Sequence, residues 1–157
     1  MQRLDDSMKL ALRTNICYLA TCSKDGIPNV VPVGLVEILD DLTIAIVDVL
    51  MNKTRKNLAE NDNVALAVTD LNRLVGYQFK GKAYVVSEGE IMEWAKEFVK
   101  RKQERRREIL ADRLKTETNP ESISKIKKLM EVEYKPKAVV LIKVNEVYRT
   151  MRGDAHE

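Results

Sequence analysis

The chain has 157 residues, of which 45% are hydrophobic and 32% charged, and its formal net charge is +3. This length is typical of one domain and this composition of a globular protein, and so mild a charge does not by itself indicate a nucleic-acid partner. The longest stretch without a charged side chain has eleven residues, Gly26 to Val36, which is far too short to span a membrane as a helix. The first residues contain acids and no apolar segment typical of a secretory signal, so we expect one cytoplasmic domain over residues 1–157.

The first half of the chain alternates short apolar segments with turns, a pattern that predicts mostly β-strands. After a helix expected over residues 4–13, the apolar and β-branched segments cover residues 16–22, 27–39, 42–49, 64–69 and 75–87. The pair Asp25-Gly26 is typical of a tight hairpin turn, so the first two strands should pair antiparallel. Between the third and fourth strands the period changes, and Asn52 as N-cap predicts a short helix over residues 52–60.

Residues 88–135 differ in kind, because they are rich in charge and lack β-branched runs. They predict helices over 90–116 and 119–133, an insertion of about residues 89–135 before a last strand over 138–149. No side chain from 100 to 108 is apolar, so we expect the middle of the first of these helices to project into solvent. The whole pattern predicts a mainly β fold, a six-stranded antiparallel β-barrel with a short helix between strands 3 and 4 and a helical pair before the last strand.

The start of the short helix concentrates positive charge. Lys53, Arg55 and Lys56 fall in its first turn, where the helix dipole is already positive and free backbone N–H groups point outward. A phosphate there would accept hydrogen bonds from those N–H groups, from the Thr54 hydroxyl and from the Lys53 ammonium. The sequence therefore predicts an anion site at this helix end, with an ordinary solvated basic face as the alternative.

A proline and a glycine interrupt the second predicted strand. Pro32 removes a backbone donor, and Gly34 lets another group approach the main chain. A flat ligand could lie against this segment, although a kinked edge strand explains the same residues. Combined with the anion site, the segment favours a phosphorylated planar cofactor.

Five segments have a specific order and spacing along the chain: residues 19–21, 26–34, 52–58, 64–68 and 76–83. In that order and spacing they resemble the FMN-binding split-barrel family related to pyridoxamine 5′-phosphate oxidase. The resemblance covers about residues 16–88 and 137–149. It implies a six-stranded split barrel and a homodimer, with one FMN in each of two clefts at the subunit interface.

The resemblance also implies a cofactor site on three segments: the phosphate-binding turn, a second-strand segment whose backbone faces the isoalloxazine, and the end of the third strand near the ribityl chain and ring. The cofactor-binding residues expected from it are Val31, Pro32, Val33, Gly34, Val47, Asp48, Met51, Asn52, Lys53 and Thr54. The family's oxidases often place an arginine on the phosphate from the position of Val31. Its absence here shifts the phosphate contacts toward Lys53 and Thr54, with Arg55 or Lys56 as further candidates.

Several other chemistries lack the residues they need. The one histidine, His156, is penultimate in the chain, so we do not expect oxidation of vitamin B6 phosphates. Cys17 and Cys22 fall on opposite faces of one strand and do not form a metal or redox motif, and no nucleophile has a basic partner nearby in sequence. The basic run 100–107 lacks interleaved aromatic residues and has acids spaced for helical pairing, which favours a solvated helix over a nucleic-acid partner.

From the resemblance we expect a dimeric FMN flavoprotein, a flavin-dependent oxidoreductase or electron carrier with a small-molecule redox partner and without metal. A deazaflavin in place of FMN stays open, and no sequence feature names the electron donor or acceptor. The alternative is a non-catalytic binding module for flavin or another phosphorylated ligand, with the basic helix as a docking surface.

Overall fold

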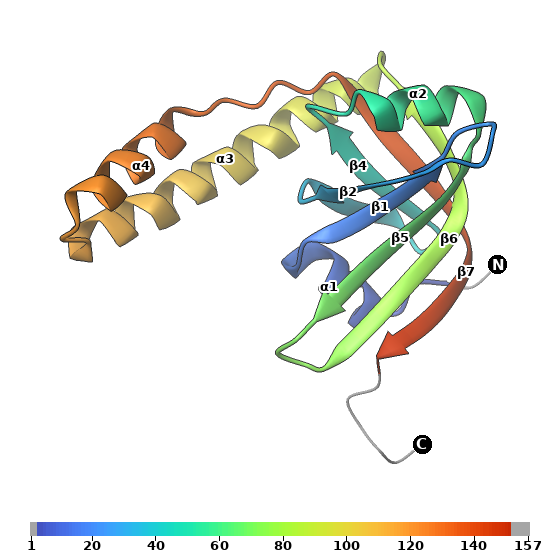
Figure 1. Ribbon diagram of the computed structural model, residues 1–157, viewed down its shortest axis with the longest axis horizontal. Helices are drawn as coiled ribbons and strands as arrows, with labels where there is room; N and C mark the ends of the chain where they lie inside the picture. The colour runs from blue at the N-terminus through green and yellow to red at the C-terminus, as the bar shows by residue number, and fades with distance from the viewer. Residues whose placement is uncertain (1–2, 152–157) are drawn as a thin grey trace.

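A computed structural model describes residues 3–151, which form one antiparallel sheet with four helices. The elements are α1 (Asp6–Thr14), β1 (Cys17–Cys22), β2 (Pro28–Val33), β3 (Val36–Asp40), β4 (Thr43–Asp48), α2 (Lys53–Glu60), β5 (Asn63–Asp70), β6 (Val75–Val86), α3 (Glu90–Thr116), α4 (Pro120–Glu131) and β7 (Ala138–Met151). The sheet has the strand order β2-β1-β5-β6-β7-β4-β3 (Figure 1). His156 lies outside the described residues.

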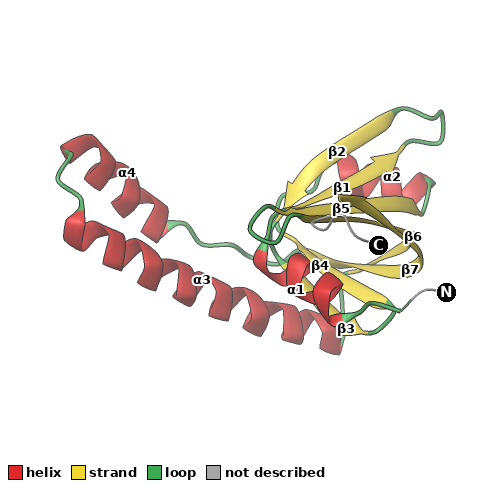
Figure 2. Cartoon of the chain, turned by 90° about the horizontal axis from the view of Figure 1, so that it is seen from below, coloured by secondary structure: helices red, strands yellow, loops and turns green. Residues whose placement is uncertain are grey.

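The expected count of six strands is wrong, because residues 27–39 form two strands, β2 and β3, separated by Gly34 and Leu35. Val33 and Val36 are both buried, so the side-chain alternation changes phase at this break. The two strands are the opposite edges of the sheet. Since the chain from Val33 to Val36 spans at most about 11 Å, the edges meet at this corner. The sheet therefore curls into an open barrel instead of a closed one (Figure 2).

The first hairpin is confirmed. β1 and β2 pair antiparallel, with Cys17 opposite Val33 and Cys22 opposite Pro28, and Gly26 in the turn has a φ of 82°. Both cysteines are free, and burial raises the pKa of the Cys17 thiol to about 12. Cys17 therefore behaves as a small apolar core residue that stays protonated.

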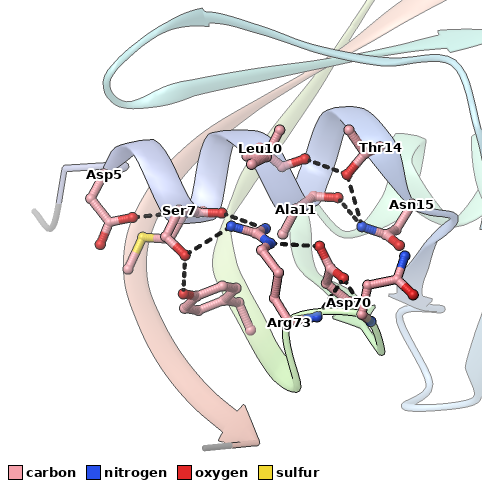
Figure 3. A network of polar contacts seen from close by, with 11 residues as sticks. Asp5, Ser7, Leu10, Ala11, Thr14, Asn15, Asp70 and Arg73 are labelled. Atoms are coloured by element: carbon pink, nitrogen blue, oxygen red, sulfur yellow. Dashed lines mark hydrogen bonds and ion pairs between the residues drawn. The ribbon is translucent and has the colours of Figure 1, made fainter. Parts of the chain in front are cut away.

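A polar network holds α1 against the turn between β5 and β6 (Figure 3). Arg73 donates to the carbonyl oxygen of Ser7 at 3.2 Å and to the carboxylate of Asp70 at 2.8 Å. The bond from Arg73 lowers the pKa of the Asp70 carboxyl below its ordinary value, so the pair stays ionised. The other side of α1 buries Met8 and Leu12 in the core, which fixes the helix across one end of the barrel.

Two apolar clusters hold the strands and α3 together. The larger lies inside the curled sheet and includes the fully buried Leu19, Ile44, Ile46, Leu66, Phe79 and Ile142. The smaller joins the outer face of β4 and β7 to the first turns of α3, through Ala45, Val47, Val139, Met92, Ala95, Phe98 and Val99. Because it is covered on both faces, β4 is buried at every position, and its four central residues are all apolar instead of alternating.

Only the first part of α3 packs on the sheet; the rest extends beyond it, and α4 folds back along this extension (Figures 1 and 2). The expectation that the middle of α3 is solvated is wrong for one face. Gln103 and Arg106 donate to the carbonyl oxygen and the hydroxyl of Tyr134 at 2.9 and 3.2 Å, and Arg107 donates to the carbonyl oxygen of Met130 at 3.2 Å. Within residues 3–151, no helix combines the length and the apolar character that crossing a membrane requires.

Gly81 marks the closest approach of β6 and β7. The register shifts beside it, and a Cβ added there would lie 2.0 Å from the carbonyl oxygen of Lys143. Gly81→Ala should therefore lower the free energy of unfolding by about 1–3 kcal/mol, measured by urea denaturation. Gly34→Ala is the control, because its Cβ would meet only the Cδ1 of Ile16 at 3.4 Å, an ordinary contact. Equal losses in the two variants would contradict the close approach.

Candidate functional site

A groove of about 780 Å³ lies between β2, the end of β4, the start of α2 and the middle of α3. Most of its wall is apolar, and the side chains that form it are Ile16, Val31, Pro32, Val33, Leu35, Val47, Val49, Leu50 and Met51. Basic side chains reach it in two places, Lys53 from α2 and Lys102 with Arg106 from α3. The start of α2 and the middle of α3 lie apart in both ribbon views, so the groove has two separate cationic regions (Figures 1 and 2).

The structure brings nine of the ten predicted cofactor residues to this groove, from positions up to 23 residues apart in sequence. These nine are Val31, Pro32, Val33, Gly34, Val47, Met51, Asn52, Lys53 and Thr54. Pro32 lies in an edge strand, where its missing N–H costs no ladder bond on the open side. The tenth, Asp48, is 1% exposed and is not part of the groove wall.

The start of α2 leaves backbone donors free. Asn52 is the N-cap, as predicted, yet its backbone is helical and its side chain accepts no capping bond. The first bond into the helix runs from the N–H of Lys56 to the carbonyl oxygen of Asn52 at 3.2 Å. Within the described residues the N–H groups of residues 53, 54 and 55 therefore have no acceptor, and the first turn contains no acid. This is the donor arrangement that binds a phosphate or carboxylate.

A buried amide network positions the Thr54 hydroxyl. The side-chain amide of Asn29 donates to the Thr54 oxygen at 3.2 Å and to the Thr21 oxygen at 3.3 Å, and the amide of Asn57 donates to Thr21 at 3.1 Å. Thr54 and Asn57 are 1% and 2% exposed. The Thr54 oxygen thus accepts a hydrogen bond, and within residues 3–151 its own O–H donates to no acceptor.

Asp48 has a structural role that the sequence did not indicate. Its buried carboxylate accepts a hydrogen bond from the N–H of Met51 at 2.7 Å and pairs through its other oxygen with the guanidinium of Arg55. This arrangement links the end of β4 to α2 and fixes the turn from which Lys53 projects. The charge of Arg55 is thereby compensated, and neither Arg55 nor Lys56 reaches the groove.

Three polar residues of the groove were missed from the sequence: Lys102, Arg106 and Tyr134. The first two lie within the charged run in which every position has a polar side chain, so periodicity could not separate the groove face from the solvent face. Tyr134 lies in the link between α4 and β7, which has no pattern of its own.

The comparisons with known proteins agree with this fold. The family described as "Pyridoxamine 5'-phosphate oxidase" matches residues 4–149. An uncharacterized protein of Methanocaldococcus jannaschii, MJ0282, is 31% identical over 153 residues, which cover 96% of this chain and 83% of that protein.

Solved structures give the same result. The crystal structure of HupZ from Group A Streptococcus superposes with a TM-score of 0.67 at 25% identity, over 94% of each chain. An FMN-binding protein from Syntrophomonas wolfei superposes with a TM-score of 0.61 over 93% of this chain and 88% of that one; at 16% identity this likeness shows the fold alone. The sheet and helices of this chain thus have the same arrangement as those of these proteins.

Proposed function

This chain belongs to the pyridoxamine 5′-phosphate oxidase family, and on that premise we propose that it is an FMN-binding flavoprotein, a flavin-dependent oxidoreductase or electron carrier for a small molecule. The observation that carries the proposal is the groove, in which an apolar slot ends at a helix start with free N–H groups and Lys53. The FMN-binding neighbour from Syntrophomonas wolfei supports the choice of cofactor.

The residues of the groove fit FMN by their chemistry. The N–H groups at the start of α2, the Lys53 ammonium and the Thr54 hydroxyl are donors suited to a phosphate. The apolar side chains of β2 and β4 are suited to a flat isoalloxazine, and the exposed main chain at Gly34 lets a ring approach closely. A bound flavin supplies the redox chemistry, while these residues bind it, orient it and exclude water from one face of its ring.

We propose the functional unit as a homodimer with the flavin at the subunit interface. Leu50 and Ile16, both in the groove wall, are 74% and 55% exposed, which leaves an apolar rim that a second copy of the chain would cover. Sedimentation analysis of the purified protein tests this directly, because a monomer at micromolar concentration would contradict the interface.

The function itself is tested by the visible spectrum and the mass of the ligand that the protein retains after gentle purification. We expect absorption near the flavin bands and the mass of FMN. The mass of a deazaflavin would instead identify a different cofactor in the same groove. Oxidation of a nicotinamide donor by the loaded protein supports the oxidoreductase. Bound flavin without turnover supports a binding module, and a protein that neither retains nor takes up flavin overturns the proposal.

A further inference from the structure

Four uncharged polar side chains lie together where α2 packs on the hairpin of β1 and β2 (Figure 1). They are Thr21 of β1, the half-buried Asn29 of β2, and Thr54 with Asn57 of α2. Thr54 and Asn57 share the buried side of the helix with Leu58, which belongs to the larger apolar cluster. Apolar side chains of similar shape could fill these positions at little or no cost in stability. Stability alone therefore does not explain the polar residues.

Three hydrogen bonds join these side chains into one network. The Thr21 oxygen accepts from the side-chain amides of Asn29 and Asn57, at 3.3 and 3.1 Å. The second hydrogen of the Asn29 amide reaches the Thr54 oxygen, at 3.2 Å. Thr21 thus anchors one amide from the sheet and one from the helix. Of the four residues, all within the described part of the chain, only Thr54 belongs to the groove wall.

The network determines which way the Thr54 hydroxyl can point. A hydroxyl group rotates to suit its partners and has a single hydrogen. Because an N–H of Asn29 already points at the Thr54 oxygen, the hydrogen of Thr54 cannot point at Asn29. That hydrogen meets no acceptor within residues 3–151, and its side chain lines the groove beside the free N–H groups of α2. An anion arriving there meets a donor whose direction is already fixed, which reduces the entropy lost on binding.

The oriented hydroxyl differs from Lys53 in what it selects. The Lys53 side chain is exposed and flexible, and its charge attracts any anion nearby. A hydroxyl held in one direction favours a ligand that places an acceptor oxygen at one position. The network therefore gives the start of α2 a selectivity that positive charge alone does not supply.

We propose that Thr21, Asn29 and Asn57 are positioning residues, which act through the Thr54 hydroxyl and strengthen the preference of the groove for phosphorylated over unphosphorylated flavin. This inference rests on the proposed function, because it takes the anion at the start of α2 to be the phosphate of FMN. The three residues lie outside the groove wall and do not touch the ligand themselves. Their effect on binding should therefore vanish when the Thr54 hydroxyl is absent.

The test is a double-mutant cycle between Asn29→Leu and Thr54→Val. Dissociation constants for FMN and riboflavin are measured by quenching of flavin fluorescence, and in the wild type FMN should bind at least about tenfold more tightly. Thr54→Val should reduce this preference about fivefold or more, because it removes a hydrogen bond to a charged group. Asn29→Leu should reduce it about threefold, because the hydroxyl is then free to rotate. In the double variant the preference should equal that of Thr54→Val, since the two changes act through one hydroxyl.

Two further variants separate positioning from a general loss of buried polar groups. Thr43→Val is the matched control, because Thr43 is also buried and hydrogen-bonded, to Asp40 and Lys143, but lies outside the groove wall. It should keep the preference for FMN. Thr21→Ser keeps the acceptor of both amides and should also keep the preference, whereas Thr21→Val should reduce it as Asn29→Leu does. If Asn29→Leu does not fold, the cycle is run with Asn29→Ala, which only removes atoms.

The preference is a ratio read within each variant, so a loss of stability that weakens both flavins equally does not imitate the result. The positioning role is overturned by equal binding of the two flavins in the wild type, by an unchanged preference in Asn29→Leu, or by a loss in Thr43→Val as large as in Asn29→Leu. Additive losses in the double variant overturn it as well, because Asn29 would then act independently of Thr54.

Inorganic phosphate distinguishes a failure of this inference from a failure of the proposed function, because it contains no flavin ring. Compared with sodium chloride of equal ionic strength, phosphate should raise the Tm of the wild type and of Thr43→Val by a larger amount than that of Asn29→Leu. If the protein takes up no flavin, FMN is discarded as the ligand and this comparison alone decides. A smaller stabilisation of Asn29→Leu then supports the positioning role, and equal stabilisation of the variants, or none of the wild type, overturns it.

Discussion

Arg55→Met should lower the free energy of unfolding by about 3 kcal/mol, measured by urea denaturation. Within residues 3–151, the variant leaves the carboxylate of Asp48, 1% exposed, with the N–H of Met51 as its one remaining partner. Removing one member of a buried pair costs about 3–5 kcal/mol because the other charge stays desolvated. The Arg55 side chain is itself 41% exposed, so water lessens the loss and we expect the lower end of that range.

Arg13→Met provides the matched control. Arg13 also pairs with a carboxylate, that of Glu37, but the two side chains are 47% and 27% exposed. A pair in this setting contributes about 0.5 kcal/mol, so its loss should hardly change the denaturation midpoint. In the double variant Asp48→Asn with Arg55→Met, part of the lost stability should return, because the stranded charge is gone. If Arg55→Met costs no more than Arg13→Met, then Asp48 does not depend on Arg55.

Most strands could be predicted from sequence because each has a local signal. The hairpin of β1 and β2 follows from Asp25-Gly26 between two apolar runs, and β7 follows from its alternation. The break between β2 and β3 was missed because no local signal marks it. Residues 27–36 are uncharged, so a change of phase at Gly34 leaves no mark in the hydrophobic pattern. What separates the two strands is that β2 pairs with β1 and β3 with β4, at opposite edges of the sheet.

From the residues alone, the groove was predictable where the local pattern is unusual, at the start of α2 and at Pro32 and Gly34; its other predicted residues came from the resemblance to the family. Cations in the first turn of a helix conflict with its dipole, and that conflict pointed to Lys53 and Thr54. The Asp48–Arg55 pair gave no such signal, because the turn that brings the two together depends on the N–H of Met51. Lys102 and Arg106 were hidden because the face of α3 that meets the groove is chosen by packing with α4 and Tyr134, not by the composition of α3.

Lys53→Glu should raise the dissociation constant for FMN about 100-fold, measured by quenching of flavin fluorescence. The variant removes a charge-assisted hydrogen bond to the phosphate and places a like charge beside it; a 100-fold change corresponds to about 2.7 kcal/mol. Lys56→Glu is the matched control, because Lys56 has the same charge in the same helix, is exposed and lies outside the groove wall. Lys56→Glu changes the net charge of the protein by the same amount. If it changes the dissociation constant for FMN less than about threefold, the effect of Lys53→Glu belongs to position 53 and not to the overall electrostatic field.

Riboflavin separates a phosphate contact from a distortion of the groove, because it has the same ring and ribityl chain as FMN without the phosphate. If Lys53 contacts the phosphate, wild-type protein binds riboflavin more weakly than FMN, and Lys53→Glu leaves the riboflavin constant unchanged. If the substitution instead disturbs the turn held by Asp48 and Arg55, both ligands weaken together. Unchanged FMN binding in Lys53→Glu would remove the start of α2 from the cofactor site, and the free N–H groups of residues 53–55 would then need another anion.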